Sequence, residues 1–297
     1  MNRRNFIQRT GLLGLSSLLS APHLSWASNS KFKMGYQLYS VNDEMKKDPI
    51  LVLKALKAIG YEDLEIFGFN SAQNSIYGYK PSQFKSILND LGMTASSGHY
   101  GFSSYLHKSS DELLHFVDQC IAAAHDMGSR YITWPWIAPP QRTIDNFKHM
   151  AKLLNIIGER VNAAGLGFAY HNHGFEFEDH NGQNGFDIIL NETDPALVKL
   201  QMDMYWVMRS STMTPKQLIA QQPGRYVMWH IKDMDAVTED YAELGQGVID
   251  YTKLLPDPIQ SGLEFYFLEQ GGNFANNSIQ SAATSAKYFK QYLQTYL

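Results

Sequence analysis

Residues 147–171, FKHMAKLLNIIGERVNAAGLGFAYH, contain one complete helix–glycine–strand unit. Apolar residues recur three and four positions apart from Phe147 to Ile157, which is the spacing of the buried face of a helix. Gly165 then tolerates the left-handed conformation in which many helices end. The short apolar run Gly167–His171 follows and predicts a buried strand.

The same order recurs along the chain, and Gly60, Gly92 and Gly128 each stand between a helical pattern and a strand pattern. Alternating strands and helices are typical of a parallel sheet. The first strand is not followed by the Gly-x-Gly-x-x-Gly sequence that is typical of dinucleotide binding. We therefore expect an α/β protein with a single (β/α)8 barrel, the TIM-barrel architecture. Its eight strands are expected at 33–38, 63–67, 93–97, 131–134, 167–171, 198–203, 227–231 and 265–269.

The first 27 residues have the features of an export signal. Arg3 and Arg4 precede an apolar run at 11–19, and Ser25 and Ala27 are the small residues that a signal peptidase reads. This order resembles a twin-arginine signal, and the apolar run is too short to span a bilayer. We expect residues 1–27 to be removed, residues 28–297 to form one barrel domain, and the mature protein to be periplasmic without stable membrane anchoring.

The charge of the chain argues against nucleic acid as a partner. The full chain has a formal net charge of −4, and residues 1–27 hold three arginines and no acidic residue, so the mature chain carries −7. An acidic protein without basic clusters is poorly suited to a phosphate backbone. The only cysteine, Cys120, lies on an apolar helical face, where we expect it to pack in the core.

Polar side chains gather at the predicted carboxyl ends of the strands, where barrels of this kind build their active sites. Oxygen ligands suit manganese or magnesium, and imidazole also admits zinc, cobalt or iron. A single strand-end acid or histidine is more often a cap or an ion-pair member. Asp203, His230 and Glu269 follow three successive strands, however, and together predict a site for a divalent metal. The complete set is Glu65, His99, His171, His173, Glu176, Asp203, His230, Lys232, Asp233 and Glu269.

Four longer stretches resemble one known superfamily. Residues 167–177, 202–207, 230–233 and 244–251 are similar to the corresponding motifs of the sugar phosphate isomerase/epimerase superfamily, which also contains xylose isomerase-like barrels and endonuclease IV. The resemblance extends over nearly all of residues 33–297. It implies an enzyme that holds a divalent metal with ligands from strands five to eight.

Carried onto this chain, the resemblance makes Asp203, His230 and Glu269 the ligands from strands six to eight. Many relatives place a glutamate where this chain has His171, so the fourth ligand is either His171 or Glu176. The usual set of three carboxylates and one imidazole favours Glu176, although a histidine is chemically adequate. The residue that is not used then orients a ligand.

The remaining strand-end residues are candidates for proton transfer and sugar contact. The candidate catalytic residues are Glu176, Glu269 and His173, with His171 as a further candidate base. The candidate substrate contacts are Glu65, His99, His171, Lys232 and Trp206. Lys232 extends to the same side of its strand as His230 and can stabilise an enolate, unless it pairs with Asp233 or Asp235 at the rim.

The expected reaction is proton transfer next to a sugar carbonyl. A divalent metal lowers the pKa of the neighbouring C–H, and the fate of the proton decides between epimerisation, isomerisation and elimination. Export, and the lack of an Arg/Lys cluster near the strand ends, favour an unphosphorylated keto-sugar or keto-glycoside. The alternatives are a non-catalytic carbohydrate-binding barrel and an endonuclease IV-like nuclease. The metal (Mn, Mg, Zn or Co) stays open, and a homo-oligomer is compatible with these features.

Overall fold

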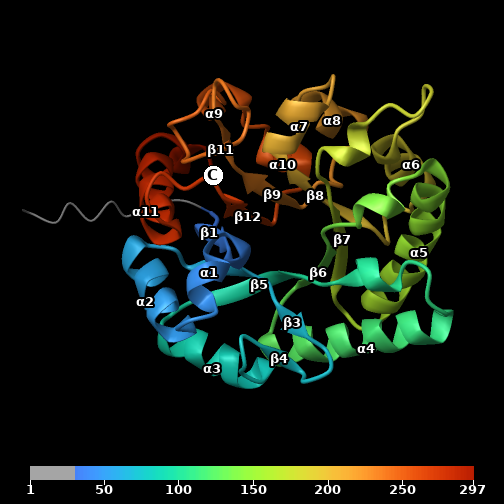
Figure 1. The fold of residues 1–297 in the computed structure, drawn as a ribbon, viewed down its shortest axis with the longest axis horizontal. Helices are drawn as coiled ribbons and strands as arrows, with labels where there is room; N and C mark the ends of the chain where they lie inside the picture. Colours follow the sequence, from blue (N-terminus) through green and yellow to red (C-terminus); the bar gives the residue numbers. More distant parts are fainter. Residues whose placement is uncertain (1–30) are drawn as a thin grey trace, which may run out of the picture.

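The structure, a computed structural model, describes residues 31–297, and eight parallel strands in it close into a barrel. β1 pairs with both β2 and β12, which closes the ring (Figure 1). The single (β/α)8 barrel and all eight expected strands are confirmed, whereas the predicted signal at residues 1–27 lies outside the described residues. The strands are β1 (Gly35–Gln37), β2 (Asp63–Ile66), β5 (Thr94–His99), β6 (Tyr131–Trp134), β7 (Gly167–His171), β8 (Lys199–Asp203), β9 (Met228–Ile231) and β12 (Phe265–Leu268).

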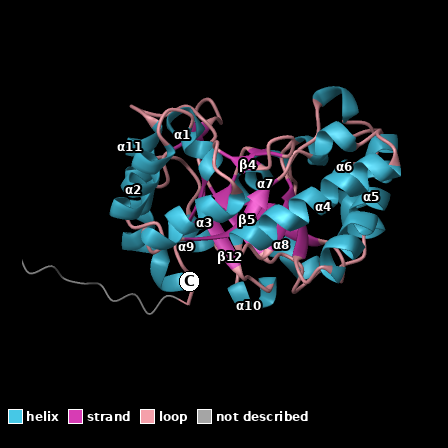
Figure 2. Cartoon of the chain, turned by 90° about the horizontal axis from the view of Figure 1, so that it is seen from below, coloured by secondary structure: helices cyan, strands magenta, loops and turns pink. Residues whose placement is uncertain are grey.

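Helices cover the outside of the barrel, and Figure 2 shows the strands at the centre with the helices around them. None of the helices between residues 31 and 297 is long and apolar enough to cross a membrane. The helices are α1 (Asn42–Met45), α2 (Pro49–Ile59), α3 (Pro81–Asp90), α4 (Ser110–Met127), α5 (Ile144–Ala163), α6 (Gly185–Glu192), α7 (Met204–Ser210), α8 (Pro215–Gln221), α9 (Tyr251–Leu254), α10 (Pro258–Ser261) and α11 (Ser278–Tyr288).

Helix α5 shows how the local sequence produces these elements. The Thr143 side chain caps its first turn by accepting a hydrogen bond from the backbone N–H of Asn146. Phe147 and Ile157 on its apolar face are fully buried, and each such side chain contributes roughly 1.5–3 kcal/mol of transfer free energy. Gly165 ends the segment with φ at 78°, in the left-handed region where a side chain is unfavourable.

The amino-terminal side of the barrel interior is apolar. Its residues form a separate small cluster, here called the apolar plug, which consists of Tyr131, Ala169, Val227, Met228 and Phe267. Outside the barrel, the main core lies between the strands and the helices, and Cys120 of α4 is fully buried in it, as expected.

Two short antiparallel hairpins follow β2 and β9 and were not expected from the sequence. The first pairs β3 (Phe69–Asn70) with β4 (Ser75–Ile76), and the second pairs β10 (Asp233–Met234) with β11 (Tyr241–Ala242). Each hairpin leaves the carboxyl end of its barrel strand, so both lie at the end of the barrel that carries the polar residues.

Candidate active site

A layer of polar side chains lies inside the barrel towards the carboxyl ends of the strands, and Glu65 of β2 is at its centre. Its carboxylate accepts hydrogen bonds of 2.6–2.7 Å from the side chains of Gln37, Ser97 and Gln201. Burial by itself raises the pKa of Glu65, but the rings of His99 and His230 outweigh it and hold the pKa well below its usual range. Glu65 is fully buried and does not line the pocket described below, whereas His99 does.

The ends of β8, β9 and β12 bring Asp203, His230 and Glu269 together, with ligand-type atoms within 4.8 Å of one another. His230 lies between two carboxylates: its Nδ1 is 2.5 Å from Glu269 Oε2, and its Nε2 is 2.5 Å from Glu65 Oε2. Burial lowers the pKa of His230, but these carboxylates outweigh it and raise the pKa to about 9. Asp203 also caps α7, because its Oδ1 accepts a hydrogen bond from the Trp206 backbone N–H.

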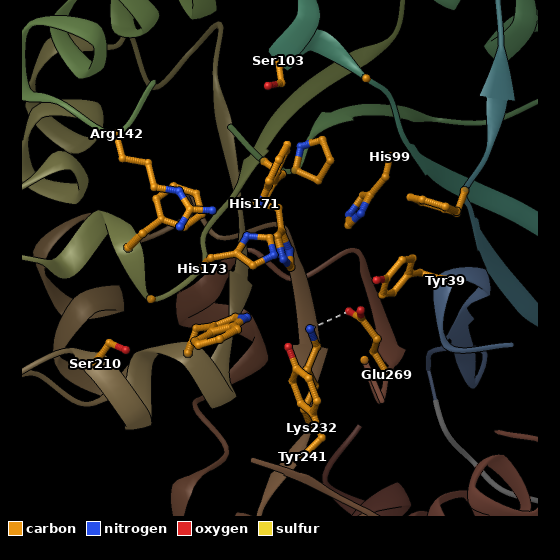
Figure 3. A pocket seen from close by; sticks show the side chains of 18 of the residues that line it. Tyr39, His99, Ser103, Arg142, His171, His173, Ser210, Lys232, Tyr241 and Glu269 are labelled. Atoms are coloured by element: carbon orange, nitrogen blue, oxygen red, sulfur yellow. Dashed lines mark ion pairs between the residues drawn. The ribbon is translucent and has the colours of Figure 1, made fainter. Parts of the chain in front are cut away.

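Lys232 lies between two of these carboxylates. Its Nζ is 2.6 Å from Asp203 Oδ2 and 2.8 Å from Glu269 Oε2, and the second of these ion pairs is drawn in Figure 3. Burial lowers the pKa of Lys232, but the two carboxylates outweigh it and raise the pKa above its usual range. Lys232 pairs with neither Asp233 nor Asp235, because both accept backbone hydrogen bonds within their own loops.

The donor atoms of this group suit a divalent cation. Asp203 Oδ2, His230 Nδ1 and Glu269 Oε2 are buried, and their close partners among the described residues are one another and Lys232 Nζ. The ligand-type atoms of Asp203, His230 and Glu269 lie within 4.8 Å of one another, so a single cation could contact all three. Two carboxylates and an imidazole are an ordinary ligand set for zinc or manganese. The residues therefore fit a divalent metal, whose entry has to displace the ammonium group of Lys232.

His171 adjoins this group from β7. Its Nε2 is 3.6 Å from Asp203 Oδ2, and its ring centroid is 4.6 Å from that of His230. The ligand-type atoms of His99, His171 and His230 also lie within 4.8 Å of one another. Burial is the main cause that holds the pKa of His171 well below its usual range, so the ring is neutral and able to coordinate a cation.

Glu176 lies outside both of these groups. It sits in the 3₁₀ turn Phe175–Phe177, where its Oε1 accepts a hydrogen bond of 2.6 Å from the Tyr170 hydroxyl. Its Oε2 accepts a hydrogen bond of 2.8 Å from the backbone N–H of His173. Burial outweighs these hydrogen bonds and raises the pKa of Glu176 to about 8, so the group is protonated at neutral pH. The turn directs this carboxyl to Tyr170 and to the backbone of His173, whereas His171 borders Asp203.

His173 lies on the surface of the pocket, close to these groups. Its ring is stacked on Phe175, with centroids 5.5 Å apart, and is 5.7 Å from that of Trp206. Burial and the ammonium group of Lys232 hold the pKa of His173 well below its usual range. The ring lines the pocket, whereas its Nδ1 is buried and makes no hydrogen bond with the described residues.

A cavity of about 980 Å³ opens at this end of the barrel (Figure 3). The predicted residues on its lining are His99, His171, His173, Trp206, Lys232 and Glu269. Aromatic side chains that the sequence did not assign to the site also line it, and these include Phe69, Phe175 and Tyr241. Their rings offer apolar faces on which a sugar ring can stack.

Two arginines on this lining correct the expectation that the site has no cluster of basic residues. Arg142 precedes α5 and Arg209 belongs to α7, and both side chains line the cavity. Neither follows a barrel strand directly, so inspection of strand ends did not find them. The prediction of an unphosphorylated sugar therefore rests on export alone.

Both the sequence and the fold match known proteins. Residues 53–257 match the family described as xylose isomerase-like TIM barrel. The chain belongs to this family. No curated protein is significantly similar to this chain in sequence.

Solved structures share the fold of this family member over most of its length. The sugar phosphate isomerase/epimerase from Parabacteroides distasonis has a TM-score of 0.74 and 23% identity, over 88% of this chain and 99% of that chain. The IolI protein with a bound zinc atom has a TM-score of 0.69 and 15% identity, over 90% of this chain and 99% of that chain. L-Ribulose 3-epimerase has a TM-score of 0.65 and 15% identity, over 89% of this chain and 95% of that chain. At these identities the similarity establishes the fold.

Proposed function

We propose that the protein is a sugar isomerase, epimerase or lyase that uses a divalent metal to remove a proton next to a substrate carbonyl. The substrate class is a keto-sugar or keto-glycoside without a phosphate on the reacting sugar. The observation that carries this proposal is the buried group of Asp203, His230 and Glu269, whose ligand-type atoms lie within 4.8 Å of one another. Membership of the xylose isomerase-like family, whose structural neighbours include sugar epimerases, supports the same type of function.

Asp203, His230 and Glu269 are the proposed ligands, with His171 as the fourth because its imidazole borders Asp203. When bound, the cation supplies polarisation of the carbonyl, which acidifies the adjacent C–H. The ligands come from the ends of rigid strands, which keeps their geometry fixed. Glu269 is engaged with His230 and Lys232, so its proposed role is that of a ligand.

His173 is the proposed base. Its ring lines the pocket, and a neutral imidazole accepts a proton without first losing one. Glu176 positions it, because the Glu176 carboxyl holds the backbone N–H of His173. The ammonium group of Lys232 lies close enough to offset negative charge that develops on a substrate oxygen.

The test is isotope exchange in deuterated water with 3-keto-glucosides and free ketoses, using metal-loaded protein. We expect deuterium at the carbon beside the carbonyl. His173→Gln should slow this exchange by roughly 100- to 10,000-fold, the contribution of a positioned general base. His115→Gln, an exposed histidine on α4, is the matched control and should leave the rate unchanged. Exchange that persists in His173→Gln would remove His173 from the mechanism, and no exchange with any ketone would reject the reaction.

Carbohydrate binding without turnover is a second candidate, and one observation favours it. Lys232 already pairs with Asp203 and Glu269, and His230 also pairs with Glu269, so these carboxylates have partners without a metal. Metal analysis of purified protein separates the two candidates. A stoichiometric divalent metal supports the enzyme, whereas metal-free protein that binds ketoses and never exchanges their protons supports the binding protein.

We also propose that the protein is exported to the periplasm after removal of residues 1–27, on the basis of the arginine pair and apolar run. Fractionation of the native producer should find the mature form in the periplasm with its amino terminus near Ser28. Changing Arg3 and Arg4 to lysine should stop export, and export that survives this change would reject the twin-arginine route.

A further inference from the structure

Beyond the reacting groups, the cavity has a second side that the proposed reaction does not use. Figure 3 shows His173 between Arg142 and the Lys232–Glu269 pair, so Arg142 faces the cavity from the side opposite the reacting groups. The cavity of about 980 Å³ is at the upper end of the range of about 300–1,000 Å³ that holds drug-sized ligands. A single hexose occupies only part of such a space.

The guanidinium group of Arg142 is held in a fixed position. Its carbon lies 3.9 Å from the ring centroid of Phe175 and 5.7 Å from that of Trp136. Its Nε and Nη2 both donate to the Ile137 carbonyl oxygen, at 3.3 Å. Nη1 has no hydrogen-bond partner among the described residues, so one edge of the group is available to a ligand. Trp136 is itself 40% exposed on the same lining and offers a free ring face.

The charge on this side of the cavity is not balanced by a buried carboxylate. Neither Arg142 nor Arg209 forms a salt bridge within residues 31–297, and Arg209 donates only to the Tyr205 hydroxyl. Glu176 is the acidic group that interacts with Arg142 from behind the loop, and its burial keeps it protonated at neutral pH. Glu178 also lines the cavity but is exposed to solvent, where water screens its charge.

We propose that Arg142, together with Trp136 and Phe175, forms a second subsite that binds an acidic group on a unit attached to the keto-sugar. The inference rests on the proposed function, because it places the keto-sugar at the Lys232 side and the attached unit at the Arg142 side. The acidic group is a carboxylate or a phosphate, since a guanidinium edge binds both in the same way. The substrate is then an acidic keto-glycoside, in which the aromatic rings contact the attached unit.

Binding of glycosides that cannot react tests the subsite independently of catalysis. Calorimetry compares phenyl, 4-carboxyphenyl and 4-phosphophenyl β-glucoside, none of which has a keto group. We expect an acidic glucoside to bind on the order of 10- to 100-fold more tightly than the phenyl glucoside, as for hydrogen bonds to charged groups. Arg142→Gln should remove this preference, and Arg142→Lys should retain part of it.

Arg160→Gln is the matched control, because Arg160 is exposed on α5 and pairs with Asp118 away from the cavity. It removes one positive charge and should keep the full preference. The acidic glucoside whose binding is weakened more by Arg142→Gln shows whether the subsite prefers a carboxylate or a phosphate. Equal binding of all three glucosides, or a preference that survives in folded Arg142→Gln, overturns the subsite. Deuterium exchange in the matching 3-keto-glucosides reports on the proposed function: its absence, with the Arg142-dependent preference intact, rejects the reaction and leaves the subsite standing.

Discussion

The two sides of the barrel interior have opposite chemistry although the same strands build both. The apolar plug contains no charged side chain, and Met228 and Phe267 in it are fully buried. Towards the carboxyl ends, Glu65, His230 and Lys232 are also buried but ionisable. Burying a charge is costly unless it is paired, and here Glu65 pairs with His230 while Lys232 pairs with Asp203 and Glu269. The plug therefore serves stability, while the polar layer is stable only as a network and is organised for chemistry.

The largest expected effect of breaking the polar layer comes from Asp203→Asn. It keeps the shape of the side chain and removes the charge of a proposed ligand, so metal affinity should fall by more than the roughly 10- to 100-fold that an outer partner contributes. Proton exchange should fall with it. Metal titration by calorimetry measures the first effect, and circular dichroism checks that the barrel remains. Undiminished metal binding in this variant would contradict the assigned site.

The opposite result is expected in the plug. Met228→Ala removes buried apolar volume and should lower the free energy of unfolding by about 2–5 kcal/mol. The metal affinity of the folded protein should stay within about threefold, because Met228 contributes no ligand. Urea denaturation and metal titration provide the two measurements. A large loss of metal affinity here would show that the two sides of the interior are not separable.

Glu176→Gln sharpens the comparison between paired and unpaired buried ionisable groups. Glu176 is a buried acid that has no cationic partner in the polar layer. Its pKa is raised by burial from 4.5 to about 8 in the folded state, so the folded protein binds more protons than the unfolded chain between these values. The stability that this group contributes is therefore fully present below pH 4.5 and is lost as the pH rises to about 8, at up to about 1.4 kcal/mol per pH unit. The glutamine variant should lack this decline and be more stable than wild type by about 1–3 kcal/mol at pH 7. Thermal unfolding from pH 4.5 to 8 tests this, and parallel curves for both proteins would be inconsistent with a raised pKa.

The smallest expected effect is a gain of function in metal binding. Lys232→Met removes the ammonium group that lies against Asp203 and Glu269, so metal affinity should rise by about tenfold or more. Lys232→Arg keeps the charge and should not show this gain. The comparison is made by titration with Mn²⁺ or Zn²⁺. Weaker metal binding in Lys232→Met would mean that the lysine supports the site and does not compete for it.

Periodicity and glycine placement predicted the barrel, because one buried face per helix and one apolar run per strand leave a regular trace in the chain. The predicted strands 131–134 and 167–171 coincide with β6 and β7. The strand-end rule also selected Asp203, His230 and Glu269, which the structure brings together. These features could be predicted because each strand, and the polar residue at its end, is specified by a short local stretch of the sequence.

Only the tertiary structure determined the distances across the barrel and the directions of individual side chains. Lys232 lies between carboxylates from two other strands, and Arg142 reaches the cavity from the far end of the loop between β6 and α5. Glu176 was the favoured fourth ligand, but a short 3₁₀ turn directs it to Tyr170, so that His171 borders the group instead. The sequence by itself determined the barrel and the strand-end positions of Asp203, His230 and Glu269. Which of them meet was decided only by closure of the sheet, because that step brings together residues that are far apart in the chain.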